Sequence, residues 1–556
     1  MAKQPLSHVD AAWLHMEDPT NLMMVTGVMT FATPLDIDHL KTVVRHRLLK
    51  FKRFRSRVVE PFLGVGMPHW ELDPHFDLDA HLHHIALPAP GGQKELQMLV
   101  SDLMSMPLDF SKPLWHYHIV DNYQGGSALV GRLHHCIADG IALMQVLSDD
   151  RPQRQRAWPK PQVKKVKQQS GLLGRAYEAF TKSATDVFTT AQQVAERLVQ
   201  EGVETINNPS HLLDLAQQGT EVTYTIGRLL ALPPDPKTVF KGPLGVSKKA
   251  AWSRPLPLND VKAIKNATGT TVNDVLIAAL AGGLRHYLVQ RGERVDELDF
   301  RAFVPVNIRK QEDVEQLGNK FGLVFLALPI FIDDPLERLM EVHRRMEALK
   351  SSPEAVVAFG ILSAMGMTPA EIQKVVVQLF ALKATAVMTN VPGPQIPLYL
   401  AGSRIKELMF WVPQSGRVGL GTSIMSYAGD VYLGVVTDVG LVADPEVIID
   451  GFYKEYNLLM GLVQDATELE PAPVAATSPG AEAALPLPSQ PDDLTRIKGI
   501  GPKMAELLRT HDIMTFTELA AADPEHLREL LRNGNGRYRL IDPTSWPEQA
   551  QELRVP

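Results

Sequence analysis

Strand-like and helix-like segments alternate in two separate stretches of this 556-residue chain, and this alternation restricts the fold more than any other feature. In the first stretch, residues 21–35 predict a strand, and residues 36–51 predict a helix with apolar side chains at helical spacing. The second stretch, from about residue 250 to residue 466, again mixes strand-like runs with helical ones. We therefore expect an α/β protein with two lobes.

The rest of the chain differs in character from these two lobes. A run with seven Lys or Arg residues and no acid opens residues 151–250, and two long helical patterns follow it. Residues 467–491 are rich in Pro and Ala, which predicts an extended flexible linker. The expected organisation is an N-terminal lobe, a basic linker with crossover helices, a C-terminal lobe, a Pro/Ala-rich linker and a small all-α domain, at residues 1–150, 151–250, 251–466, 467–491 and 492–556.

The composition narrows the class of protein. With 45% hydrophobic and 21% charged residues the chain is typical of soluble globular proteins, and its net charge of −7 argues against bulk nucleic-acid binding. A single cysteine excludes an internal disulfide and a multi-cysteine zinc site. The apolar run at residues 355–367 is short of the ~18 to 20 residues of a spanning helix, so it predicts a buried helix or a re-entrant surface element. With no apolar leader visible, we expect a cytoplasmic protein.

The stretch GRLHHCIADGIAL, residues 131–143, holds two adjacent histidines, the single cysteine and an Asp-Gly pair. A metal site is disfavoured because neighbours on a strand point to opposite faces, so one ion cannot easily bind both His134 and His135. A Cys-His nucleophile pair is disfavoured because catalytic partners usually come from distant segments, and a lone Cys136 more often packs in a core. Spacing alone leaves two interpretations equally open: a general base with a pKa of about 6.5, and a buried core histidine.

A second pair, His83 and His84, makes the choice harder. No Asp-Gly turn follows this pair, and polar and apolar residues alternate around it. We interpret the segment as a partly exposed strand. The alternative is a weak metal cluster formed by His75, His81 and His83.

The pattern HHxxxDG from His134 to Gly140 resembles the motif of the coenzyme A-dependent acyltransferase superfamily, which includes chloramphenicol acetyltransferase and the condensation domains of peptide synthetases. Seven further segments within residues 4–466 resemble the bacterial wax ester synthase/diacylglycerol acyltransferase family, in that family's order. They are PLSHVDAAWL (5–14), FDLDAHLHHIALPAPG (76–91), KPLWHYHIVD (112–121), TVNDVLIAALAGGLRHYL (271–288), VPVNIR (304–309), LGNKFG (317–322) and TNVPGP (389–394).

The resemblance implies two chloramphenicol-acetyltransferase-like lobes with the active site in a channel between them. It also implies that His135 is the general base, that His134 supports it, and that Asp139 orients the loop by pairing with a basic residue. The remaining candidates, for contact with substrate or oxyanion, are Gly140, Asn273 and Asp274.

The implied reaction moves a long-chain acyl group from acyl-CoA to a fatty alcohol or a diacylglycerol, which yields a wax ester or a triacylglycerol. Acyl-CoA is a substrate here, and the resemblance implies neither a cofactor nor a metal. The enzyme would touch the inner membrane or a lipid inclusion peripherally, through the basic residues 151–167 or the apolar residues 355–367. Two alternatives stay open: a condensation-type acyltransferase with a carrier-bound acyl donor, and a lipid- or nucleic-acid-associated scaffold with inactive acyltransferase lobes.

The C-terminal residues 492–556 resemble a helix-hairpin-helix module. Gly499, Ile500 and Gly501 would form the hairpin, and Pro502 would open the next helix. Backbone amides at such a hairpin can hold a phosphate, but this unit carries many acidic residues. We therefore expect it to contact protein rather than nucleic acid.

Overall fold

The computed structural model describes residues 4–61, 66–137, 225–307 and 321–468, with residues 367–369 and a few single residues left out, and parts of residues 492–552. The chain divides into two compact units, Met1–Glu470 and Pro471–Pro556. Asp139, Gly140 and the basic residues 151–167 lie outside the described residues, so their predicted roles stay predictions.

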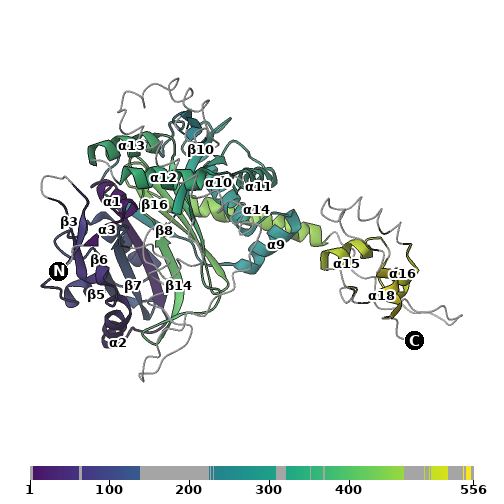
Figure 1. The fold of residues 1–556 in the computed structure, drawn as a ribbon, viewed down its shortest axis with the longest axis horizontal. Helices are drawn as coiled ribbons and strands as arrows, with labels where there is room; N and C mark the ends of the chain where they lie inside the picture. The colour runs from purple at the N-terminus through teal and green to yellow at the C-terminus, as the bar shows by residue number, and fades with distance from the viewer. Residues whose placement is uncertain are drawn as a thin grey trace. The chain divides into compact units, whose positions relative to one another are not determined.

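The first sheet of the large unit is built mainly from the N-terminal part of the chain (Figure 1). Its strand order is β13-β14-β2-β7-β6-β5 among the described residues. All neighbours in it are antiparallel except β5 and β6. The strand bounds are β2 Met24–Phe31, β5 Leu82–Ala86, β6 Trp115–Tyr123, β7 Gly126–His134, β13 Tyr399–Leu400 and β14 Ser403–Trp411.

The predicted strand at residues 21–35 is confirmed as β2. The predicted helix at residues 36–51 is shorter: α2, Ile37–Val43, continues as a π-helical turn, Val44–Leu48, and a 3₁₀ turn, Lys52–Arg55, follows. A small three-stranded sheet has the order β1-β4-β3, and two of its strands follow this region in the sequence. Its strands are β1 Gln4–Pro5, β3 Ser56–Val59 and β4 His69–Leu72.

The second sheet of the large unit has the order β11-β10-β12-β15-β16-β8, with β9 paired to β16. β12 is parallel to both β10 and β15, and the other pairs are antiparallel. The strand bounds are β8 Lys248–Trp252, β9 Leu256–Pro257, β10 Asp299–Asn307, β11 Phe321–Pro329, β12 Ala386–Pro392, β15 Leu420–Tyr427 and β16 Asp430–Asp438.

One strand exchange joins the two halves of the large unit. β14, from the C-terminal half, pairs with β2 of the N-terminal half, with Leu408 opposite Met29. The Trp252 and Trp411 rings meet edge to face, with centroids 5.5 Å apart. One sheet therefore contains strands from both predicted lobes, residues 1–150 and 251–466.

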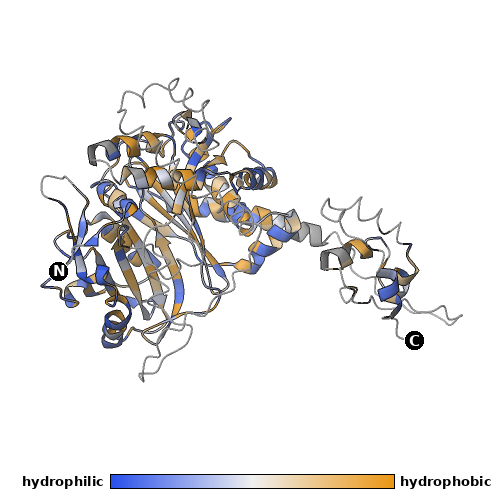
Figure 2. Ribbon diagram, viewed as in Figure 1, coloured by the Kyte–Doolittle hydropathy of each residue, from blue (hydrophilic) through white to orange (hydrophobic). Residues whose placement is uncertain are grey.

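Helices cover both sheets (Figure 1). Figure 2 shows that α12 and α13 are largely hydrophobic. The bounds are α1 His8–His15, α3 Gln93–Ser105, α9 Leu258–Thr268, α10 Val272–Gln290, α11 Pro335–Lys350, α12 Glu354–Met365, α13 Ala370–Leu382 and α14 Glu446–Glu468.

Helix α10 forms the centre of the second core. It is buried almost along its whole length and packs against α14. A Cβ atom on Gly283 would lie 2.7 Å from the backbone nitrogen of Phe452. Glycine is therefore what lets the two helix backbones approach this closely.

The small unit has a core of its own. Leu494, Ile500, Leu508, Phe516 and Trp546 are among its buried residues. Its described helices are α15 Pro502–Arg509, α16 Phe516–Ala521 and α18 Trp546–Glu552. The predicted helix start at Pro502 is confirmed.

Candidate active site

His135 follows directly after the last residue of β7. Its backbone N–H donates to the Met23 carbonyl at 2.7 Å. This hydrogen bond attaches the turn after β7 to the residue just before β2. The side chain is 4% exposed. Its imidazole stacks on the indole of Trp13, with centroids 4.3 Å apart and planes 9° apart, and it also meets the Phe321 ring at 5.5 Å. The proposed base is thus a buried imidazole among aromatic rings.

These two rings come from opposite halves of the large unit, and α12 holds them together. α12 packs against both α1, which carries Trp13, and β11, which begins at Phe321 (Figure 1). A Cβ on Gly322 would lie 1.7 Å from the Ala355 carbonyl oxygen. A Cβ on Gly366 would lie 1.7 Å from the His8 carbonyl oxygen. The apolar segment at 355–367 is therefore in large part a packed helix that positions the site.

His134 is completely buried, and its hydrogen bonds define its tautomer. The Cys136 backbone N–H donates to His134 Nδ1 at 3.1 Å. Since Nδ1 accepts, a neutral imidazole must carry its proton on Nε2, which lies 3.5 Å from Glu17 Oε2. The same Glu17 oxygen accepts the Met23 N–H, so His134 and Glu17 brace the segment that binds the His135 backbone.

Cys136 is buried, as the core interpretation predicts. Burial raises the pKa of its thiol well above the ordinary value, and nearby Asp10 adds to the rise. A nucleophilic cysteine needs a thiolate, which this environment disfavours. The Cys-His alternative therefore loses support.

Arg53 anchors the turn that follows His135. Its Nη1 lies 3.3 Å from Asp10 Oδ2 and donates to the Ile137 carbonyl at 3.1 Å. Asp10 is fully buried on α1, so Arg53 ties α1 to Ile137 within the histidine motif. The resemblance implies that Asp139 pairs with a basic residue, and Arg53 is one candidate for it. Asp139 itself lies outside the described residues.

Asn273 and Asp274 begin α10, and they differ in environment. The Asp274 carboxylate accepts the Thr271 N–H at 2.9 Å as a helix cap and lies 2.7 Å from His343 Nδ1. Asn273 is exposed, and its Oδ1 accepts from Asn390 Nδ2 at 3.1 Å. Asp274 is thus bound locally, whereas Asn273 is open to a ligand.

The strand register relates Asn273 to Phe321 and hence to His135. Phe321 pairs with Asn307 at the end of β10. β12 runs parallel to β10 and carries Asn390 near the same end. The Asn273–Asn390 pair and the Phe321 ring beside His135 therefore lie toward the same end of the strands of the second sheet. No direct contact joins them among the described residues.

Four other histidines, on or next to β5 and β6, form a separate group. His83 and His116 share a 2.6 Å hydrogen bond and their rings stack, while His81 and His118 lie against them. Burial lowers the pKa of His116 to about 3 and that of His118 to about 4. In the described part of the chain, no three His, Cys, Asp or Glu side chains are arranged to hold a metal ion.

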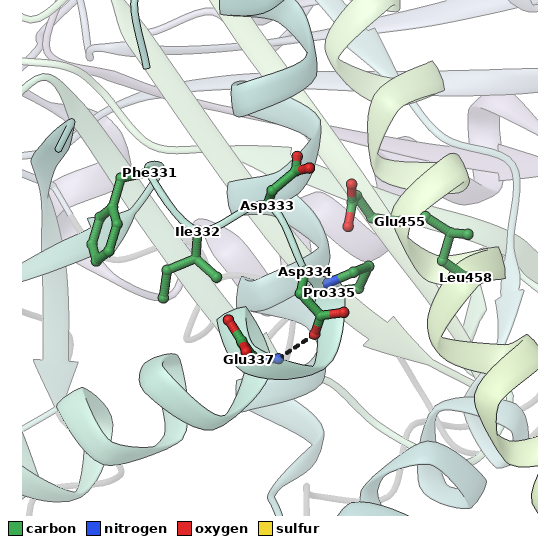
Figure 3. A pocket seen from close by; sticks show the side chains of 8 residues that line it. All are labelled: Phe331, Ile332, Asp333, Asp334, Pro335, Glu337, Glu455 and Leu458. Atoms are coloured by element: carbon green, nitrogen blue, oxygen red, sulfur yellow. Dashed lines mark hydrogen bonds between the residues drawn. The ribbon is translucent and has the colours of Figure 1, made fainter. Parts of the chain in front are cut away.

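A hollow of about 740 Å³ lies elsewhere, between the β11–α11 connection and α14 (Figure 3). Phe331 and Leu458 line it together with Asp333, Asp334 and Glu337. No basic side chain is among its lining residues. Without a basic side chain in its lining to hold the phosphates of coenzyme A, this hollow is a poor site for that substrate.

Sequence reasoning did not single out Trp13, Glu17, Arg53, Phe321 or Asn390. Three of them stand in the segments that carried the resemblance, at 5–14, 317–322 and 389–394, which was a usable signal. Glu17 and Arg53 stand in none of these segments, and only the folded chain brings them to the histidines.

The family models agree with the geometry. The wax ester synthase/diacylglycerol acyltransferase catalytic domain matches residues 6–276, and the C-terminal domain of the same family matches residues 317–460. The RS2/RL21/YNQ2 helix-hairpin-helix domain matches residues 494–554.

Individual proteins agree as well. A protein named as a probable diacylglycerol O-acyltransferase of Mycobacterium tuberculosis is 28% identical over 458 residues, with 79% of this chain and 92% of that protein covered. The solved wax ester synthase/diacylglycerol acyltransferase of Marinobacter aquaeolei is similar in fold, with a TM-score of 0.59, 23% identity, and 83% of this chain and 100% of that chain covered. The first condensation domain of the calcium-dependent antibiotic synthetase has a TM-score of 0.53 at 16% identity, covering 84% of this chain and 97% of that domain.

Both lobes thus have the chloramphenicol-acetyltransferase-like fold that the histidine motif implied. The chain belongs to the wax ester synthase/diacylglycerol acyltransferase family and carries an additional helix-hairpin-helix domain at its C-terminal side.

Proposed function

We propose that this protein transfers a long-chain acyl group from acyl-CoA to a fatty alcohol or a diacylglycerol, with His135 as the general base. The observation that carries the proposal is the placement of His135, buried at the end of β7 between aromatic rings of both halves. A buried imidazole in a fixed turn can take a proton from a bound hydroxyl, which typically contributes ~10² to 10⁴ in rate.

The reaction needs no covalent enzyme intermediate. His135 removes the hydroxyl proton while the oxygen bonds to the thioester carbonyl carbon, and the carbonyl electrons move to its oxygen. When this tetrahedral intermediate collapses, the carbon–sulfur bond breaks, and the departing thiolate takes the proton from the imidazolium. The buried, protonated Cys136 thiol fits a mechanism without a thiolate nucleophile.

Asn273 is our candidate donor to the acyl carbonyl oxygen. Because Asn390 donates to Asn273 Oδ1, the Nδ2 end of Asn273 is the one that can donate to a ligand. A donor of this kind stabilises the oxyanion, and losing one typically costs ~10² to 10³ in kcat. We assign Asp274 a supporting role, since its carboxylate caps α10.

The decisive experiment offers palmitoyl-CoA to the purified protein with hexadecanol or dipalmitoylglycerol in parallel, and follows free CoA and the ester formed. Ester formation with either acceptor, lost in folded His135→Ala, supports the proposal. No ester with either acceptor from folded protein would overturn it. Ester formed only from a carrier-bound acyl donor would instead favour the condensation-type alternative.

We also propose peripheral contact with a lipid surface beside the histidine motif. Met106 is 51% exposed and Phe110 is 39% exposed, and the Phe110 ring packs edge-on against His134. Exposed apolar side chains next to a site for lipid substrates suit an interface. No helix in the described part of the chain is both long and apolar enough to cross a membrane.

Vesicle sedimentation with anionic liposomes tests this contact. Met106→Ser should bind less than wild type. Met340→Ser, which changes a methionine of similar exposure (45%) on α11, should bind like wild type. Equal binding by all three proteins would contradict this surface.

For the C-terminal module we propose contact with a protein partner. It folds around its own core, and the Thr515–Glu518 capping box stabilises the start of α16. None of the residues proposed for acyl transfer belongs to this module.

A further inference from the structure

The indole of Trp13 covers one face of the His135 imidazole. The centroids are 4.3 Å apart and the planes differ by 9°, and Trp13 is 5% exposed. Its indole N–H is buried and has no hydrogen-bond partner in the described part of the chain. Since an unpaired buried donor is unfavourable, a hydrogen bond does not explain an indole at this position. What the indole supplies is a large aromatic face against the ring of the base.

That face interacts differently with the two charge states of the base. A cation over an aromatic face is attracted by the ring quadrupole, and indole is the best of the natural rings. His135 is neutral before proton transfer and becomes an imidazolium as the hydroxyl oxygen attacks. The stacking is therefore stronger in the transition state than in the ground state, which is the condition for a contribution to kcat.

Two acidic side chains near the histidine motif have other partners. Asp10 on α1 pairs with Arg53, and Glu17 lies 3.5 Å from His134. β2 and β11 contain no charged residue within their bounds. Phe321 meets the imidazole from 5.5 Å at 46°, so it offers a less parallel face than Trp13.

We propose that Trp13 is a positioning residue for the base, which holds the His135 ring in place and stabilises its imidazolium through the indole face. This inference rests on the proposed function, since it requires His135 to accept the proton. It adds a residue of α1 to the mechanism and predicts an order of activity set by the aromatic face.

The experiment compares wild type, Trp13→Phe and Trp13→Leu in the palmitoyl-CoA assay, each checked by thermal unfolding. In Trp13→Leu, kcat should fall by roughly 3- to 30-fold with little change in the KM for palmitoyl-CoA. Trp13→Phe should lie between the other two. The matched control is Trp411→Phe, since Trp411 is equally buried, has an equally unpaired N–H and stacks on no histidine; its kcat should stay near wild type.

A second readout separates this role from mere packing. Because the indole favours the imidazolium, its loss should move the acid limb of the kcat/KM profile to lower pH, by about half a unit to one unit in Trp13→Leu. Unchanged kcat and an unmoved limb in folded Trp13→Leu, with wild type active and His135→Ala inactive, would overturn this inference alone. If Trp13→Leu fails to fold, the same result in Trp13→Phe decides against it. A wild type without ester formation overturns the proposed function, and this inference with it.

Discussion

At the scale of single residues, the two adjacent histidines differ in environment. The His134 ring is held by the Cys136 N–H and by Glu17, so it acts as a brace. The His135 ring lies against aromatic rings from both halves. Their separation follows from the strand end, because neighbouring side chains on a strand point to opposite faces.

Replacing Cys136 separates the thiol interpretation from the base interpretation. Cys136→Ala should keep kcat within about twofold of wild type and lower stability by about 1 kcal/mol, because it removes one buried atom. His135→Ala should abolish turnover while the protein stays folded. Free-CoA release and thermal unfolding measure both effects. Complete loss of activity in folded Cys136→Ala would revive a thiol mechanism.

The buried histidine group predicts a loss of stability in mild acid. Burial lowers the pKa of His118 from 6.5 to about 4, so the folded protein keeps it neutral where the unfolded chain protonates it. Stability is therefore present above pH 6.5 and falls as the pH drops toward 4, by up to about 1.4 kcal/mol per pH unit for each such group. His118→Gln should flatten this fall in urea unfolding measured from pH 7 to pH 4.

His75→Gln serves as the control for this measurement, since His75 is exposed and stands outside the stacked group. The control should retain the wild-type slope. A wild-type slope in folded His118→Gln would show that His118 does not contribute.

At the scale of elements, α12 is the helix for which the tertiary structure adds most to the expectation from the sequence. An apolar run of this kind predicts a buried helix or a surface element, and its hydrophobicity alone cannot distinguish them. In the fold, two close backbone approaches define its position, at Gly322 and at Gly366. The helix thereby links α1 and β11, which carry the two rings around His135.

Gly366→Ala tests this link. A Cβ there would lie 1.7 Å from the His8 carbonyl oxygen, so α12 must move from α1. We expect a loss of about 1 to 3 kcal/mol in stability together with reduced kcat. Gly461→Ala on α14, where a Cβ would meet nothing within 4 Å, should be neutral or slightly stabilising. Equal melting temperatures for the two variants would argue against a tight α1–α12 contact.

At the scale of the whole molecule, the chain has two compact units with separate cores. All residues assigned to acyl transfer belong to the first unit. Removing residues 471–556 should therefore leave kcat within about twofold of wild type, with the unfolding of the large unit unchanged. A well-folded but inactive truncation would show that the helix-hairpin-helix domain takes part in catalysis.

Local patterns of the sequence were enough to identify the histidine motif, the strand at β2 and the start of α15. These features depend on residues that are neighbours along the chain, through strand alternation, helix capping and motif spacing. The family was identified from a series of such short segments in their order along the chain. The pairing of β14 with β2, the bridge made by α12, and the stacking of Trp13 on His135 were decided by the tertiary structure alone. Each joins segments more than a hundred residues apart, and no local periodicity specifies which distant surface will cover an apolar side chain.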